Sequence, residues 1–134
     1  MNKFIICLCL FACVFSVSID DAVNHLVSHA NSQSVSRCAA YVANALQAGG
    51  FRFTRQKSAY MYRTNGVLNS IGYRQIERPG SFKKGDITVT DRNNAHPDGH
   101  IAMWSGNAWI SDFVQHSEYV YRSNQPPVYY YRYD

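Results

Sequence analysis

The sequence has few of the features that mark membrane proteins, nucleic-acid-binding proteins and repeat proteins. Apart from one run near its N-terminus, it contains no long apolar segment, no internal repeat and no low-complexity block. Its 134 residues carry a formal net charge of only +4, and the lysines and arginines are scattered instead of forming a dense basic stripe. This length suits one domain. The composition therefore predicts a single soluble domain that binds no nucleic acid.

The one apolar run has the features of a secretory signal peptide. Lys3 is followed by an uncharged apolar segment, residues 4–15, and then by Ser16-Val17-Ser18. The run is shorter than the roughly 20 residues that a transmembrane helix needs. We predict that residues 1–18 are a signal peptide and that residues 19–134 form one domain. The protein is then secreted and extracellular, or periplasmic if its source is bacterial, and makes no membrane contact after cleavage. An uncleaved membrane anchor is the alternative.

Cysteine is scarce in the predicted mature chain. Three of the four cysteines, Cys7, Cys9 and Cys13, lie in the predicted signal peptide, so cleavage leaves Cys38 alone. Cleavage also removes one lysine, which lowers the formal charge from +4 to +3. A disulfide scaffold is excluded for the mature chain, although a secreted protein would permit one. A single thiol indicates an intermolecular bridge, a reactive group or a small buried side chain.

Helical patterns fill the first half of the chain. Asp20-Asp21 are suited to cap and charge the start of a helix over residues 22–30. A second helix is predicted with Ser34 or Ser36 as its N-cap and Gly49-Gly50 as its stop. Its apolar stripe consists of Val35, Cys38, Ala39, Val42, Ala45 and Leu46. A third helical segment covers residues 57–63, and a further turn or two follows in "VLNSIGY".

Strand patterns begin at Tyr73, where the apolar period changes to two. Five short segments are separated by turn-rich stretches: "YRQIE", "DITVT", "HIAMW", "WISDF" and "VYYYRY". Helices followed by a strand meander predict the α+β class, with an antiparallel sheet covered by helices on one face. The "SGN" between two apolar runs predicts a hairpin.

Cys38 lies in the first turn of the second predicted helix. Unpaired backbone N–H groups and the positive end of the helix dipole stabilise a thiolate there, so the position predicts a lowered thiol pKa and a nucleophile. The same residue lies on the apolar stripe, so a structural role in the core is the alternative.

A nucleophilic cysteine needs a base, and His100 is the best placed of the five histidines. It follows Gly99 and opens the predicted strand "HIAMW". His96, Asp98 and His100 alternate in the loop before this strand, which raises the alternative of a metal site. A loop with proline and glycine is a poor rigid ligand set, and no other cluster completes a zinc site.

A third group must orient the imidazole, and Asp112 on the next strand is the candidate. If the hairpin loop centred on Gly106 has three residues, His100 faces Asp112 directly. If the loop has two residues, Ser111 and Phe113 flank the face of His100 instead. Gln115 and His116 are the other candidates for this role.

Three motifs in the chain resemble those of NlpC-type and CHAP-type cell-wall peptidases. They are "SRCAAYVANAL", "FKKGDITV" and "GHIAMWSGNAWISDF", which together span most of the region after the signal peptide. Within that group, "HPDGHIAMWSG" and "WISDFVQ" are most similar to type VI secretion amidase effectors and their secreted eukaryotic homologues. The resemblance implies a papain-like fold with Cys38 as nucleophile, His100 as base and Asp112 as the third residue. One departure is the signal peptide, because type VI effectors are exported without one.

The resemblance also implies the reaction. We expect a secreted, antibacterial cysteine peptidase or amidase that cleaves amide bonds in the stem or cross-link peptides of bacterial peptidoglycan, acts as a monomer and needs no cofactor. Two alternatives remain. The ten tyrosines and two tryptophans would suit a wall-binding module with a buried Cys38, and His96, Asp98 and His100 would serve a metal-dependent amidase.

Overall fold

The computed structural model describes residues 16–134, and residues 1–15 of the predicted signal peptide lie outside the described part. The helices are α2 (Ile19–His29), α3 (Cys38–Ala48), α4 (Met61–Thr64) and α5 (Val67–Ser70). The strands are β1 (Tyr73–Ile76), β2 (Ile87–Thr90), β3 (His100–Trp104), β4 (Trp109–Ile110) and β5 (Val128–Tyr133). All five strands fall within the segments predicted from the period-two patterns, and the α+β class is confirmed.

The sheet is antiparallel throughout, but its strand order differs from a meander. The order is β1-β5-β2-β3-β4, so only β2, β3 and β4 follow one another as predicted. The C-terminal strand β5 inserts between β1 and β2, pairing Tyr73 with Tyr133 on one side and Ile87 with Tyr131 on the other. This pairing joins segments far apart in the chain, which local periodicity does not encode.

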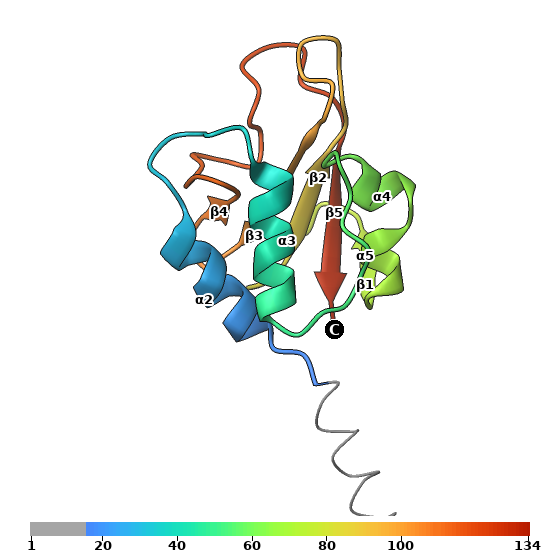
Figure 1. Cartoon of the computed structure of the whole chain (residues 1–134). Helices are drawn as coiled ribbons and strands as arrows, with labels where there is room; N and C mark the ends of the chain where they lie inside the picture. Colours follow the sequence, from blue (N-terminus) through green and yellow to red (C-terminus); the bar gives the residue numbers. More distant parts are fainter. Residues whose placement is uncertain (1–15) are drawn as a thin grey trace, which may run out of the picture.

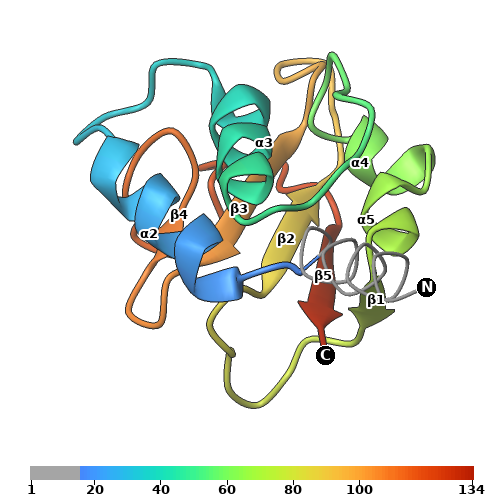
Figure 2. The same ribbon diagram turned by 60° about the horizontal axis from the view of Figure 1, so that its bottom comes forward.

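Helices α2 and α3 lie side by side over the sheet, with α3 next to β3, as Figures 1 and 2 show. Their buried residues, including Leu26, Val42 and Leu46, join Ile101 and Met103 of the sheet in one hydrophobic core. This packing fixes the N-terminal end of α3 beside the start of β3. The two residues predicted to carry the chemistry, Cys38 and His100, are the first residues of those two elements.

Both long helices begin at positions that differ from the predicted ones. Helix α2 starts at Ile19 because Ser18 is its N-cap and accepts a hydrogen bond from the Asp21 N–H at 3.1 Å. The two aspartates lie in its first turn, where they complement the helix dipole. Helix α3 starts at Cys38 after Arg37, with no side-chain cap. The serines proposed as its N-cap belong instead to the loop before it.

The residues just before α2 are part of the domain. The Ser18 N–H donates to the Gly49 carbonyl at 2.8 Å, and Val17 packs against the hydrophobic core. A side chain at Gly49 would meet the Ser18 carbonyl oxygen at 2.7 Å, so glycine permits this close approach. The predicted cleavage after Ser18 would therefore remove the N-cap of α2. No helix within residues 16–134 is long and apolar enough to cross a membrane.

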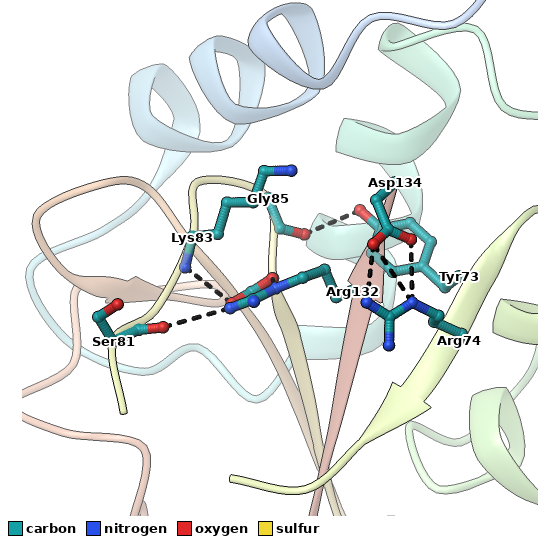
Figure 3. A network of polar contacts seen from close by, with 8 residues as sticks. Tyr73, Arg74, Ser81, Lys83, Gly85, Arg132 and Asp134 are labelled. Atoms are coloured by element: carbon teal, nitrogen blue, oxygen red, sulfur yellow. Dashed lines mark hydrogen bonds and ion pairs between the residues drawn. The ribbon is translucent and has the colours of Figure 1, made fainter. Parts of the chain in front are cut away.

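A network of polar contacts holds the inserted strand β5 in the sheet (Figure 3). Arg132 on β5 donates to Asp86 from Nε at 2.9 Å and from Nη2 at 2.7 Å, and it also bonds the Ser81 carbonyl. The Asp86 side chain is only 4 % exposed. Arg74 on β1 pairs with Asp134 in the same view, but both side chains are exposed. Of the two ion pairs, only Arg132–Asp86 is largely buried.

Candidate active site

Cys38 is the first residue of α3, is partly buried and forms no disulfide. Its backbone N–H is one of the first four of the helix, which have no partner within the helix itself. The loop before it is held in place by Asp112. The carboxylate oxygen Oδ2 accepts hydrogen bonds from the Val35 N–H at 2.6 Å, the Arg37 N–H at 3.2 Å and the Ser34 hydroxyl at 3.3 Å. Asp112 therefore fixes the backbone that leads into the nucleophile.

The ionisation of Asp112 supports this anchoring role. Burial alone would raise the pKa of its carboxyl group, but the N–H groups of Val35 and Arg37 outweigh burial and hold the pKa below its ordinary value. The carboxylate is therefore charged at neutral pH. Ser36, between the two donors, has φ of 59°, a left-handed conformation that non-glycine residues rarely adopt. The anchored loop thus makes a sharp turn directly before Cys38.

The prediction of a lowered thiol pKa at Cys38 is wrong for this structure. Burial, and to a smaller extent the negative charges of Asp112 and Asp98, raises the pKa of the Cys38 thiol to about 11. The N–H groups of Ile101 and Ala39 act in the opposite direction but do not compensate. The start of a helix favours a thiolate, but desolvation in the folded protein is the larger effect. The resting protein therefore carries a neutral thiol at neutral pH.

His100 is buried at the start of β3, with 8 % of its surface exposed. Its Nε2 atom lies 2.7 Å from Oε1 of Gln115. The other end of the Gln115 amide, Nε2, donates to the Ser117 carbonyl at 3.0 Å, which fixes the orientation of the amide. The imidazole therefore donates its Nε2–H to Gln115. In the neutral ring the lone pair then resides on Nδ1, ready to accept a proton.

The environment of His100 keeps its ring neutral. Burial lowers the pKa of His100 below its ordinary value of 6.5. The hydrogen bond to Gln115 and the charge of Asp112 act to raise the pKa, but burial is the larger influence. At neutral pH the pair of groups is thus a thiol and an imidazole, and not a thiolate and an imidazolium.

The β3–β4 hairpin and the turn that follows it place Gln115, and not Asp112, at the histidine. Trp104 pairs with Trp109 and Met103 with Ile110, so the loop has its two central residues at Gly106 and Asn107. Of the two registers left open by the sequence, this is the one that does not place Asp112 opposite His100. The chain then turns after Ile110, which leaves the Asp112 carboxylate at the loop before α3 and brings Gln115 to the ring.

One cleft of about 390 Å³ brings these groups together. Cys38, His100 and Asp112 all line it, so the three residues predicted from the sequence do lie in one site. Its other walls come from residues 95–99, from Phe113 and from the segment with Val120 and Tyr121. A second hollow of about 680 Å³ shares His96 and Tyr121 with it and extends it toward residues 93–94 and 122–124. The two hollows lie next to each other on the same face of the site.

His96 and Asp98 take part in other contacts. The His96 ring stacks on Tyr121, with centroids 4.0 Å apart and planes 5° from parallel. The Asp98 carboxylate accepts a hydrogen bond from the Ser58 hydroxyl at 2.6 Å. Within residues 16–134, no group of three or more His, Cys, Asp or Glu side chains is arranged to hold a metal ion.

Two residues at or beside the cleft are not leading candidates from the sequence. Gln115 is only a secondary candidate for the partner of His100, because the turn after Ile110 that brings it to the ring has no periodic pattern. Tyr121 was not singled out, because it lies in an irregular loop with no pattern that points to a site. Several of the tyrosines that suggested a wall-binding surface are buried instead: Tyr62, Tyr73, Tyr130 and Tyr131.

Comparison with known proteins gives a match in the solved structures. No protein-family model matches the sequence, and no curated relative matches it. The chain is similar to a protein in the native type VI effector–immunity complex Tae3–Tai3 from Ralstonia pickettii, with 38 % identity and a TM-score of 0.78. The match covers 87 % of this chain and 99 % of that chain. The selenomethionine form of the same complex matches at 38 % identity with a TM-score of 0.74, covering 84 % of this chain and 99 % of the other.

Proposed function

This chain belongs to the family of type VI effector–immunity proteins represented by Tae3–Tai3, and we propose that it corresponds to the effector of such a complex and not to the immunity protein. Its activity would be that of a secreted cysteine peptidase or amidase that cleaves amide bonds in peptidoglycan peptides. The complex contains two kinds of protein, and an immunity protein needs no catalytic groups. One observation favours the effector kind: Cys38 at the start of a helix shares a cleft with a buried histidine whose tautomer leaves Nδ1 free to accept a proton.

The proposed reaction begins from the neutral pair. As Sγ of Cys38 attacks the substrate carbonyl carbon, the thiol proton moves to Nδ1 of His100, and the carbonyl π electrons move to oxygen. The tetrahedral intermediate collapses when the C–N bond breaks, and the imidazolium gives its proton to the leaving amine. A thioester remains on Cys38. Water, deprotonated by His100, then attacks the thioester and releases the acid and the free thiol.

Each remaining site residue has a part in this reaction. Gln115 keeps the His100 ring in the required orientation and tautomer through the 2.7 Å bond. Asp112 positions the loop before Cys38 and lies close enough to His100 for its charge to stabilise the imidazolium that forms. The backbone N–H of Cys38 is available to the developing oxyanion. Helix α3, which begins with Cys38, and strand β3, which follows it in the chain and begins with His100, support the proposal of a papain-like fold.

The substrate assignment rests on two lines of support. The motifs around Cys38 and His100 resemble those of cell-wall amidases, and the matched structure is a type VI effector–immunity complex. The extended cleft suits a cross-linked polymer better than a small compact ligand. A protein that blocks the cleft, as an immunity partner would, is the kind of partner to expect. The signal peptide remains a prediction, and with it the proposal that the protein is secreted and antibacterial.

Mass spectrometry of muropeptides tests the proposal. Purified sacculi are digested with the full mature protein, and the soluble products are separated and weighed with and without EDTA. We expect new products that correspond to hydrolysed amide bonds in stem or cross-link peptides, in the same yield with and without the chelator. Products cleaved only in the glycan chain would contradict the amidase proposal, and loss of products in EDTA with recovery in zinc would favour a metal-dependent enzyme.

A further inference from the structure

Cys38 lines a further hollow that the reaction described above does not use. This hollow has a volume of about 210 Å³ and is bordered by residues 36–40, by Lys57 and Ala59, and by Asp98. His100 lines the cleft of about 390 Å³ and is not part of this hollow. Cys38 and Asp98 line both spaces and therefore lie between them. The proposed nucleophile thus has a hollow on each side.

The position of His100 assigns the two hollows to the two halves of the substrate. In the proposed reaction the imidazolium gives its proton to the leaving amine, so this amine must lie within hydrogen-bond reach of the ring. The amine half of the scissile amide then occupies the cleft that His100 lines. The acyl half, which stays on Cys38 as the thioester, extends to the other side, into the hollow of about 210 Å³. We call this space the acyl hollow.

The lining of the acyl hollow has an excess of positive charge. Arg37 and Lys57 line it and are exposed, and neither takes part in the ion pairs found within residues 16–134. Asp98 is the one acidic residue among the described residues that line it, and its carboxylate already accepts a hydrogen bond from the Ser58 hydroxyl at 2.6 Å. The acyl hollow therefore offers two cationic residues that no ion pair occupies.

A third cation lies at the border of the acyl hollow. Arg55 donates from Nη2 to the carbonyl of Ala40, a lining residue, at 3.4 Å. Its Nη1 donates to the side-chain oxygens of Asn44 and Gln47, both at 2.9 Å. Because these partners are neutral amides, they position the guanidinium and leave its charge uncompensated. The local field therefore favours an anion on the acyl half of the substrate over a neutral or cationic group.

We propose that the acyl hollow is a subsite for a carboxylate on the acyl half of the substrate, with Lys57 and Arg37 as its specificity-determining residues. The proposal rests on the thiol mechanism and the substrate class proposed above. Peptidoglycan stem peptides carry two such groups, the α-carboxylate of a γ-linked D-glutamyl residue and the free carboxylate of a diamino acid. Either group becomes neutral when it is amidated, and a carboxamide forms weaker hydrogen bonds with cations than a carboxylate does.

Paired peptides test the subsite. Cross-linked stem peptides are prepared with the D-glutamyl carboxylate free or amidated, and with the diamino-acid carboxylate free or amidated. We expect the wild type to have a roughly 10-fold higher kcat/KM for one free form than for its amide, because a charge-assisted hydrogen bond is the stronger one. The pair that shows this difference identifies the carboxylate that the acyl hollow binds.

Two substitutions and a matched control test the residues. Lys57→Met and Arg37→Met should each reduce the preference for the carboxylate and leave the thermal transition unchanged, because both residues are exposed. The Arg37 N–H, which bonds Asp112, is retained in the second variant. Lys84→Met removes the same charge from the surface beside α2, where Lys84 pairs with Asp20 at 2.9 Å, and should keep the full preference.

Binding to an inactive variant separates the subsite from the reaction. Calorimetric titration of Cys38→Ala with the same peptide pairs measures affinity without cleavage. Tighter binding of one carboxylate form, reduced when Lys57→Met is added, would retain the subsite even if the wild type cleaves neither peptide, and the proposed reaction would then be rejected. Equal affinity within both pairs, no binding of any peptide, or a preference unchanged by Lys57→Met and Arg37→Met would overturn the subsite, even if the peptides are cleaved.

Discussion

Oε1 of Gln115 lies 2.7 Å from Nε2 of His100, and the amide nitrogen of Gln115 is bound to the Ser117 carbonyl. Because the amide cannot turn over without losing that second bond, the imidazole is held in one tautomer. Nδ1 is left as the proton acceptor. The base of the proposed reaction is thus selected by a residue that touches neither the thiol nor the substrate.

Removal of the Gln115 amide should therefore impair turnover without unfolding the protein. We expect Gln115→Leu to lower kcat roughly 100-fold, because an imidazole free to rotate and change tautomer spends little time in the reactive geometry. Gln115→Glu keeps an acceptor at the same distance and should retain more activity than Gln115→Leu. Steady-state kinetics on a soluble muropeptide dimer measure both. Equal activity in the two variants would show that the bond does not orient the base.

Asp112→Asn should affect the loop before Cys38 more than the histidine. The carboxylate oxygen accepts three hydrogen bonds from this loop, and the neutral amide oxygen of asparagine accepts hydrogen bonds more weakly than a carboxylate does. We expect a loss of about 1 kcal/mol in the free energy of unfolding, because these hydrogen bonds lose their charge assistance. Activity should fall less than in His100→Ala, which lacks the base. Urea denaturation beside a rate assay separates these outcomes. A variant as stable as the wild type but inactive would assign Asp112 to catalysis alone.

The pH dependence follows from the neutral thiol and imidazole. The base form of His100 prevails above its pKa, and burial lowers that pKa, so kcat/KM should fall only at pH values below about 6.5. A thiolate–imidazolium pair would behave differently, because it would lose activity on the alkaline side when the imidazolium loses its proton. We expect no such loss up to the pH at which Cys38 ionises, near 11. A bell-shaped kcat/KM profile centred near neutrality would contradict the neutral pair.

The ion pairs that hold β5 should differ in their contribution to stability. Arg132→Ala removes the charged partner of the buried Asp86 carboxylate and leaves it the Lys83 N–H, and we expect a loss of about 3 kcal/mol in the free energy of unfolding. Arg74→Ala is the matched control, because its partner Asp134 is exposed and solvent replaces the lost contact. Chemical denaturation of both variants gives the comparison. Similar losses in the two would mean that burial of Asp86 is not the deciding factor.

Much of the site could be predicted because its parts are local. Cys38 stands at a helix start and His100 at a strand start, and both positions follow from short sequence patterns. The partner of His100 could not be derived, because the chain leaves the sheet after Ile110 and an irregular turn, which no periodic pattern encodes, brings Gln115 to the ring. The insertion of β5 between β1 and β2 depends on pairing between distant segments, which no local pattern records.

The direction of the pKa shift of the Cys38 thiol could not be predicted from the sequence for a related reason. The position of Cys38 in its helix is visible in the sequence, but its desolvation by the folded chain is not. The same holds for Tyr121, whose position in the wall of the cleft follows from no sequence pattern. Chemistry that depends on the position of an element can be found from sequence, whereas chemistry that depends on burial needs the structure.

Digestion of purified sacculi by Cys38→Ala, beside the wild type at equal concentration, shows whether cleavage depends on the thiol. Alanine removes the thiol of a partly buried side chain and keeps the helix, so the thermal transition should change little. We expect that wild-type protein releases peptide-cleaved muropeptides and that folded Cys38→Ala releases none. Release of the same muropeptides by Cys38→Ala at the wild-type rate would contradict a cysteine-dependent enzyme.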